Sequence, residues 1–417
     1  TVSPEMEAPK LKWLKRHLPE TWEQAGKFLD LADFLTYRAT SRDIRSLCTL
    51  VCKWQYLGHE GPCGSWDREY IHSIGLDGAF TEGRVADTVM PLGCPAGNLT
   101  QAAADNLGLT TSCRVGVGSI DAHAGGLGLL GAVWDASSSS ALRKLESALA
   151  LIGGTSNCHM AVSQEPRFIA GLWGPYFGAM VPGMWLTEGG QSAAGSAIDH
   201  VIEDHANAAS LKREAARTGR TVYEILNQEL DRLAAASGSH PRALLTREIH
   251  VLPDFLGNRS PYADPHSRAL IDGLSLDESI TSQALLYYAV VQAIAYGTRD
   301  IIRAMNSAGY SIDRIFVTGG GTRNPVWLEE HANALNMPLV LPREPDAVLL
   351  GAAILGAAGS DLMADVPTAM QAMCHAGQTI TPDPAVTSYH DVKFEIFRDL
   401  YRESLHRRQR MRPFGKD

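Results

Sequence analysis

The pattern of apolar and polar positions divides the chain into a helical first part and an α/β second part. Amphipathic or apolar stretches predict helices at 11–18, from Pro19, at 32–40, and in a cysteine-rich segment that ends at Trp54. Later, apolar strands are predicted at 148–152, 314–318 and 338–341, and helices at 282–308, from Pro325 and at 348–357. Strands that alternate with helices in this order favour a parallel α/β core.

A carboxylate lies at the junction between a predicted strand and a predicted helix. The strand covers 114–118, the helix begins near Ala122, and Asp121 stands between them. In open α/β sheets such a junction faces the crevice that binds ligands, where a carboxylate could act as a general base toward a hydroxyl group. Asp121 could instead only cap the following helix. The segment by itself leaves both interpretations open.

Two predicted strands end in glycine turns, Gly153-Gly154-Thr155-Ser156 and Gly319-Gly320-Gly321. Backbone N–H groups at such turns can bind phosphates, although neither turn matches the P-loop or the Gly-x-Gly-x-x-Gly pattern. One turn of this kind is most simply structural. Two of them, with a carboxylate at a third junction, favour a nucleotide-phosphate site with a base nearby.

Three further residues could contact a ligand or could be structural. Glu188 opens a run of small residues, 188–197, which would let a backbone approach a flat ligand such as adenine, while the carboxylate binds hydroxyl groups. The alternative is a close helix–helix contact with an exposed glutamate. Lys53 precedes Trp54 and could bind a ligand or cover a core ring with its stem. Asn324 before Pro325 is a predicted helix N-cap.

Other segments predict surface structure. The serine-rich residues 135–147 predict a flexible or inserted loop, and residues 203–221 predict a pair of surface helices. His200 and His205 are five residues apart and do not share a helix face, so they predict a solvated surface and not a metal site. The arginine-rich residues 402–412 continue an amphipathic pattern from Phe394 and predict a C-terminal helix with a basic face.

Composition narrows the class of protein. A length of 417 residues allows two or three domains or one bilobal unit. A composition of 45% hydrophobic and 20% charged residues is typical of a globular protein. A net charge of −9 argues against nucleic-acid and anionic-membrane partners. Seven scattered cysteines suggest reduced thiols and a cytoplasmic location, and Cys48 and Cys52 lack the second pair of a zinc site. No apolar run is long enough to span a bilayer, and no signal peptide is recognisable.

Together these segments resemble the FGGY family of carbohydrate kinases, within the actin/hexokinase/Hsp70-like ATPase superfamily. The resemblance covers nearly the whole chain, and its Cys-Lys-Trp and Glu-Gly-Gly-Gln-Ser-Ala motifs are similar to the ribulokinase branch, especially D-ribulokinase-type members. It implies a two-lobed, ribonuclease H-like α/β fold with the first lobe incomplete. Residues 1–121 would be the remainder of the N-terminal sugar-binding domain, and 122–417 the C-terminal nucleotide-binding domain. The matching segments are 47–56, 118–126, 153–156, 173–177 with 188–193, 253–261 and 318–325.

The resemblance also implies a role for each matching residue. Asp121 would be the catalytic base, and Lys53 and Glu188 would contact the ketose beside it. The implied reaction transfers the γ-phosphoryl group of Mg-ATP to a ketopentose, expected to be D-ribulose, which gives D-ribulose 5-phosphate. The resemblance assigns no residue of this chain to the metal, and a homodimer is compatible with the family. The residues expected around the nucleotide are Gly154, Thr155, Gly190, Gly319, Gly320 and Asn324.

The chain departs from the family pattern in one respect. Family members begin with an Asp-x-Gly-Thr-x-Ser/Gly-x-Arg hairpin that supplies the first phosphate-binding turn and a carboxylate for magnesium, and this chain contains no such segment. We therefore expect the chain to be N-terminally truncated. The alternative function is that of an inactive form that binds sugar, nucleotide or a partner subunit without phosphoryl transfer.

Overall fold

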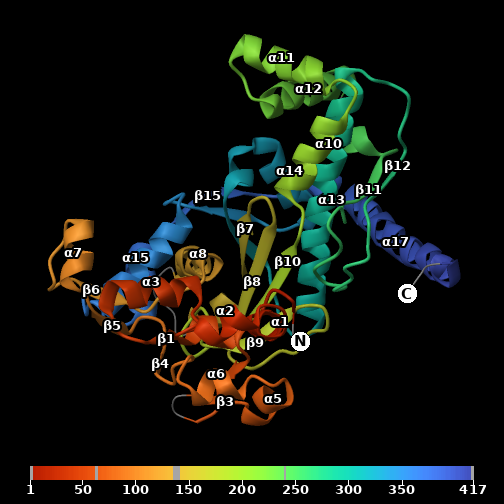
Figure 1. The fold of residues 1–417 in the computed structure, drawn as a ribbon. Coiled ribbons are helices and arrows are strands. Elements are labelled where there is room, and N and C mark those ends of the chain that lie inside the picture. The colour runs from red at the N-terminus through yellow and green to blue at the C-terminus, as the bar shows by residue number, and fades with distance from the viewer. Residues whose placement is uncertain (1–2, 62–63, 135–140, 239–240, 415–417) are drawn as a thin grey trace.

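The residues before the glycine-rich helix α8 (Asp121–Leu130) form short helices and two-stranded sheets (Figure 1). The computed structural model describes residues 3–61, 64–134, 141–238 and 241–414. The helices of this part are α1 (Glu7–His17), α2 (Pro19–Gln24), α3 (Leu31–Thr40), α4 (Leu47–Lys53), α5 (Arg68–Ser73), α6 (Asp77–Thr81) and α7 (Gln101–Leu107). The paired strands are β1 (Arg45–Ser46) with β4 (Val89–Met90), β2 (Tyr56–Leu57) with β3 (Ser65–Trp66), and β5 (Pro95–Asn98) with β6 (Arg114–Gly116).

A seven-stranded mixed sheet lies at the centre of the molecule, in the order β15-β14-β13-β7-β8-β10-β9. Its strands are β7 (Ala148–Gly153), β8 (Asn157–Ser163), β9 (Trp173–Phe177), β10 (Trp185–Gln191), β13 (Arg314–Thr318), β14 (Leu339–Pro342) and β15 (Ala376–Ile380). The predicted parallel core is correct for β14, β13 and β7. The other neighbouring strands pair antiparallel; between β7 and β8 the short connection 154–156 returns the chain beside the strand it has just left.

Both faces of this sheet are covered by helices, as the apolar strand residues require. In β7, Leu149 and Leu151 belong to one apolar cluster and Ala148 and Ala150 to another, so alternate side chains enter opposite layers. One layer contains α13 (Ile280–Ser307) and α14 (Pro325–Leu335), and the other contains α8 and α15 (Ala347–Gly359). The last two helices touch through their backbones, since a Cβ at Gly351 would lie 1.8 Å from the Ala124 carbonyl oxygen.

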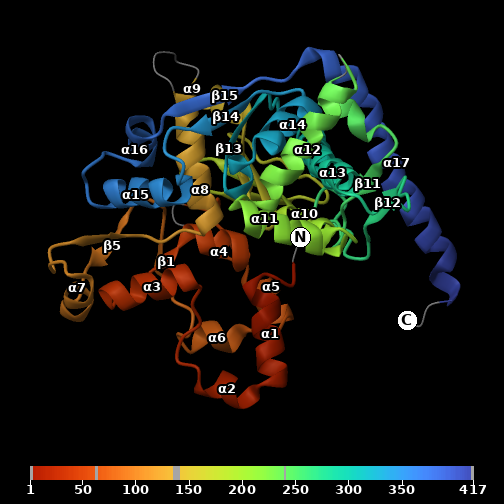
Figure 2. The same cartoon turned by 90° about the horizontal axis from the view of Figure 1, so that it is seen from above.

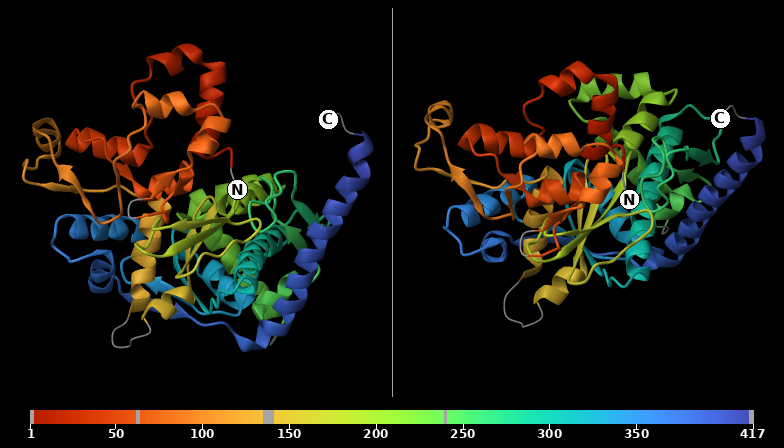
Figure 3. Two further views of the ribbon diagram at one scale, coloured as in Figure 1. Left: turned by 90° about the horizontal axis from the view of Figure 1, so that it is seen from below. Right: turned by 60° about the horizontal axis from the view of Figure 1, so that its bottom comes forward.

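The remaining helices surround these layers. They are α9 (Ala141–Glu146), α10 (Gly195–Asp204), α11 (Ala208–Thr218), α12 (Val222–Ala236), α16 (Val366–Met373) and α17 (Thr387–Met411), and a small sheet pairs β11 (His250–Leu252) with β12 (Leu270–Asp272). The structure confirms the predicted helices at 11–18, 282–308 and 348–357 to within a few residues, and it confirms the C-terminal helix, which already begins at Thr387. Figures 2 and 3 show α1, α2, α5 and α6 standing apart from α13 and α17, with α4 next to α8.

Two predictions are corrected. Residues 141–146 of the predicted loop form helix α9, because Leu145 is buried in the apolar core, and residues 135–140 lie outside the described residues. The strand before Asp121 is β6, which pairs with β5 outside the central sheet. Asp121 therefore does not follow a strand of the open sheet, and its position depends on α8 instead.

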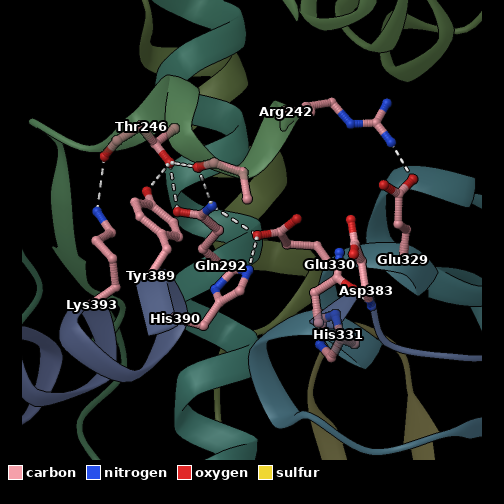
Figure 4. A network of polar contacts seen from close by, with 12 residues as sticks. Arg242, Thr246, Gln292, Glu329, Glu330, His331, Asp383, Tyr389, His390 and Lys393 are labelled. Carbon is pink, nitrogen blue, oxygen red and sulfur yellow. Dashed lines mark hydrogen bonds and ion pairs between the residues drawn. The ribbon is translucent and has the colours of Figure 1, made fainter. Parts of the chain in front are cut away.

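A buried polar network attaches α17 to α13 and α14 (Figure 4). The Glu330 carboxylate accepts hydrogen bonds from Tyr288 and from Gln292 Nε2 (2.8 Å), and it lies 3.4 Å from His390 Nε2. Lys393 donates to the carbonyl oxygen of Thr246 at 2.9 Å, at the end of the 3-10 helix Arg242–Thr246. Within the described part of the chain, no helix combines the length and the apolar character that crossing a membrane requires.

Candidate active site

A cavity of about 710 Å³ opens where the two predicted glycine turns meet. Gly154 and Thr155 line it from the end of β7, and Gly320 and Asn324 line it from the segment between β13 and α14. Trp327 closes one wall and stacks on His331, with their ring centroids 3.6 Å apart. Four of the six residues expected around a nucleotide thus line one cavity.

Gly319 holds the two turns together without lining the cavity. Its φ is +104°, and a Cβ there would lie 2.1 Å from the carbonyl oxygen of Gly153. A residue other than glycine would be strained at this φ and would also collide with the backbone at the end of β7. The close approach of β7 and β13 at the cavity therefore depends on this one glycine.

Asn324 caps α14, as its position before Pro325 predicts. Its Oδ1 accepts a hydrogen bond from the Val326 N–H at 3.1 Å and another from Asn227 Nδ2 at 3.0 Å. Its Nδ2 donates to Tyr287 Oη at 2.6 Å, and that hydroxyl donates to Asn227 Oδ1 at 3.0 Å. The three side chains form a closed ring that fixes the wall of the cavity between α12, α13 and α14.

Asp121 is the first residue of α8 and is exposed at its N-terminal end. The N-cap position is occupied by Ile120, so the carboxylate is not the helix cap, and its Oδ1 accepts a hydrogen bond from the Ala122 N–H at 2.7 Å. A Cβ on Gly125 would lie 2.7 Å from Cδ1 of Ile152, at the end of β7. Since four residues of helix span about 6 Å, Asp121 lies roughly one turn from the strand that leads into the Gly153-Gly154 turn.

Glu188 lies on β10, opposite Met160 of β8, and its side chain is 18% exposed. Its Oε2 is 3.5 Å from Nε2 of His123, an α8 residue with a 1% exposed side chain. Burial by itself would raise the pKa of Glu188, but the hydrogen bond and charge of His123, together with the charges of Lys53 and Arg259, lower it. Glu188 is therefore ionised at neutral pH.

Four charged groups act on Cys158 of β8. Burial is the main cause that raises the pKa of its thiol to about 11, the negative charges of Glu188 and Asp121 act in the same direction, and the positive charges of Arg259 and Lys53 oppose them. Lys53, Asp121 and Glu188, which the sequence predicts at the sugar, thus form a charged cluster close enough to Cys158 to influence its thiol, although they are far apart in sequence. The structure adds Arg259 to this cluster.

The cavity and the charged cluster lie on opposite sides of β8. Asn157 lines the cavity, and the next residue, Cys158, lies in the cluster. Successive side chains of a strand point to opposite faces, so the start of β8 and the preceding turn 153–156 separate the two.

Gly190 does not join the cavity. Among the described residues it lines a much smaller space of about 20 Å³, and a Cβ there would lie 2.8 Å from Cδ of Arg259. Its lack of a side chain lets Arg259 pack on β10. The Arg259 guanidinium lies 5.2 Å from the centre of the Trp173 ring and 2.9 Å from Oε1 of Glu5.

Several site residues were not found from the sequence. Asp199, Tyr223 and Asn227 line the cavity from α10 and α12, on either side of the predicted surface helices at 203–221, and the sequence predicts none of the three at a site. His123 is two residues from Asp121, and its spacing from Cys48 and Glu188 carries no recognisable pattern. In the described ranges, no group of three or more His, Cys, Asp or Glu side chains could hold a metal ion.

Known proteins resemble this chain over most of its length. Residues 149–360 match the C-terminal domain of the FGGY family of carbohydrate kinases. An FGGY carbohydrate kinase domain-containing protein of Danio rerio is 45% identical over 405 residues, which cover 96% of this chain and 73% of that protein. The D-ribulokinase of Saccharomyces cerevisiae is 38% identical over 384 residues, which cover 86% of this chain and 53% of that protein.

The fold is also found among solved structures. The crystal structure of a xylulose kinase from Brucella ovis superposes with a TM-score of 0.72 at 25% sequence identity. The superposition covers 96% of this chain and 72% of that one. The similarity therefore includes the segment before α8 as well as the central sheet.

Proposed function

Because this chain belongs to the FGGY family of carbohydrate kinases and is a sugar phosphotransferase, we propose that it transfers the γ-phosphoryl group of ATP to D-ribulose. The observation that carries the proposal is the position of the turn 153–156. It lies between a cavity of about 710 Å³ and a cluster that contains Lys53, Asp121 and Glu188. Such an arrangement can hold a nucleotide on one side of the turn and a polyhydroxylated acceptor on the other.

The volume and the glycine lining of the cavity suit a nucleoside triphosphate. Backbone N–H groups of glycine turns bind phosphate oxygens without a side chain in the way. Gly195, which also lines the cavity, has no room for a side chain, since a Cβ there would lie 2.7 Å from the Gly154 carbonyl oxygen. Phosphoryl transfer depends mainly on positioning and on neutralisation of charge, which such turns supply.

Magnesium belongs to the proposal as the partner of ATP. Mg²⁺ is usually held by substrate phosphates, water and one or two carboxylates. We assign no protein ligand to this ion. When bound, it would neutralise charge on the phosphates beside the turn 153–156.

Asp121 is the proposed general base. Its carboxylate is exposed, lies at the end of α8 nearest the turn 153–156, and is free of a capping role. It would accept the proton of the terminal hydroxyl group of the sugar as that oxygen attacks the γ-phosphorus. Lys53 and Glu188 would bind other oxygens of the ketose, the ammonium as a donor and the carboxylate as an acceptor.

The choice of D-ribulose rests on the similarity to the yeast D-ribulokinase and on the two motifs around Lys53 and Glu188. A homodimer and a cytoplasmic location remain proposals as well. All six cysteines in the ranges that the structure describes are free, which fits a reducing compartment.

The test is ADP formation by the 417-residue chain with a panel of acceptors. D-ribulose, L-ribulose, D-xylulose, D-ribose and glycerol are each supplied with Mg-ATP, and a reaction without sugar measures ATP hydrolysis. We expect the highest kcat/KM with D-ribulose. Equal or higher kcat/KM with glycerol or an aldopentose, or no sugar-dependent ADP at all, would overturn the proposal.

A further inference from the structure

One buried imidazole joins the three elements that carry the proposed sugar-site residues. His123 belongs to α8, and its Nδ1 lies 3.1 Å from Sγ of Cys48 on α4. Its Nε2 lies 3.5 Å from Oε2 of Glu188 on β10. The sequence separation of His123 from Cys48 is 75 residues, so the contact exists only in the folded chain.

Each of these three elements contributes one residue to the charged cluster. Lys53 is the last residue of α4, five residues after Cys48, and Asp121 is the first residue of α8. Two residues of a helix differ by about 200° in direction, so the side chain of His123 points into the protein while Asp121 faces solvent. The imidazole thus fixes α4, α8 and β10 relative to one another from behind the cluster.

Charge strengthens both contacts. Burial by itself would lower the pKa of His123, but the charges of Cys48 and Glu188 and the hydrogen bonds to them raise it to about 10. Burial by itself would raise the pKa of Cys48. The hydrogen bond from Cys52 and the charge of His123 outweigh burial and lower this pKa well below its ordinary value. The imidazole, whose pKa is raised, therefore lies between two groups whose pKa values are lowered, and Lys53 and Arg259 are the other cations that act on Glu188.

We propose that His123 is a positioning residue of the sugar site, which holds the Glu188 carboxylate at a fixed place relative to Asp121 and Lys53. This inference rests on the proposed function, because Glu188 is assigned to the sugar only there. A hydrogen bond to a charged group corresponds to roughly a tenfold or larger change in affinity. Loss of the imidazole should therefore raise the KM for D-ribulose about tenfold and leave the KM for ATP unchanged.

The experiment is a double-mutant cycle between His123→Ala and Glu188→Gln, read as KM for D-ribulose and for ATP. If His123 acts through Glu188, His123→Ala changes the KM for D-ribulose less than threefold in the Glu188→Gln background. His123→Gln, whose amide can still donate to Glu188, should recover part of the loss. Cys48→Ser should also be milder than His123→Ala, because a hydroxyl can replace the thiol as partner of Nδ1.

His390→Gln is the matched control. His390 is also fully buried, and its Nε2 lies 3.4 Å from a carboxylate oxygen of Glu330, but it is in the network between α13 and α17. This variant should lower the melting temperature without changing the KM for D-ribulose. It separates the loss of any buried histidine–carboxylate contact from the loss of this one.

A second readout does not depend on turnover. The ring ¹⁵N chemical shifts of His123 should report a charged ring at pH 7 in the sugar-free protein and a lower pKa in Cys48→Ala. A neutral ring at pH 7, multiplicative effects in the double-mutant cycle, or an unchanged KM for D-ribulose in folded His123→Ala would each overturn the inference. If the wild-type chain phosphorylates no sugar, the proposed function fails and the role of His123 fails with it.

Discussion

Asp121 illustrates how one carboxylate can be interpreted in two ways until its surroundings are known. Its position before an apolar helix is typical of an N-cap, yet the cap position is occupied by Ile120. Gly125 of α8 packs closely against Ile152 at the end of β7. Asp121 is four residues before Gly125, so it lies about one helical turn from the end of β7. An exposed carboxylate in that place is suited to take a proton from a bound hydroxyl group.

Asp121→Asn should lower kcat for D-ribulose phosphorylation by ~10²–10⁴-fold, the usual contribution of a general base. Asparagine keeps the size of the side chain and an oxygen that accepts from the Ala122 N–H, so ADP affinity and thermal stability should not change. The measurement is steady-state ADP formation at saturating substrates. Asp77→Asn is the control, because Asp77 is likewise the first residue of a helix. Turnover of Asp121→Asn within threefold of wild type would exclude Asp121 as the base.

At the same scale, the sequence could predict residues whose role is local. Asn324 before Pro325 predicts a cap, and the structure confirms it. His123 could not be identified, because its role depends on Cys48 and Glu188, which are brought to it only by packing. Gly190 resembles a nucleotide-site residue by motif, but its neighbour in the structure is the Arg259 side chain.

At the scale of elements, the junction between β7 and β13 depends on Gly319. Gly319→Ala should destabilise the protein by about 2 kcal/mol or more, because this combination of φ and ψ costs a residue other than glycine roughly 1–3 kcal/mol and the new Cβ would meet the Gly153 carbonyl oxygen. Gly320→Ala, where the added Cβ has no atom within 4 Å, should change stability by less than about 0.5 kcal/mol. Urea unfolding of the two variants is the measurement. Equal destabilisation would mean that the turn does not hold the two strands together.

The buried network under α17 should make stability depend on pH. Burial raises the pKa of Glu330 to about 7, above its ordinary value of 4.5. A raised folded-state pKa favours the folded protein below pH 4.5, and this contribution is lost as the pH rises through 7. Relative to Glu330→Gln, the wild-type chain should therefore lose stability between pH 5 and pH 8.

Urea unfolding at these two pH values checks that expectation. Comparison with Glu330→Gln isolates this carboxyl group from its neighbour His390, whose pKa burial lowers to about 3. The stability that this neutral imidazole contributes is fully present above pH 6.5 and decreases as the pH falls below that value. Its pH dependence is therefore opposite to that of Glu330. Glu329→Gln is the control, since Glu329 is half-exposed and pairs with Arg242. The same wild-type-to-variant difference at both pH values would contradict a buried, protonated Glu330.

At the scale of the whole molecule, the order of elements in the second half of the chain could be predicted, and the mixed sheet could not. Apolar periodicity locates β7, β13 and α13, because each has an unbroken apolar face. The antiparallel β8, β10 and β9 carry polar and glycine positions, among them His159 and Glu188, so they lack a clear strand pattern. The sequence predicts a loop at helix α9 because the segment is rich in serine. A single buried leucine in it, Leu145, is too weak a signal to indicate a helix.

The division into a sugar-binding domain ending at residue 121 and a nucleotide-binding domain beginning at 122 remains a prediction. One apolar cluster extends from Ala8 through Leu127 to Cys374 and thus includes both sides of this boundary. Lys53 comes from the first segment, whereas Glu188 and the cavity come from the second. The proposed reaction therefore needs both segments in one molecule.

The central claim is that the phosphoryl group moves from ATP to the sugar past the turn 153–156, with Asp121 as the base. Phosphorus-31 NMR of a reaction of the 417-residue chain with Mg-ATP and D-ribulose tests it most directly. We predict a sugar phosphate monoester, D-ribulose 5-phosphate, that grows in step with ADP and is absent with Asp121→Asn. Inorganic phosphate as the product, a monoester formed equally by Asp121→Asn, or unchanged ATP would contradict the account.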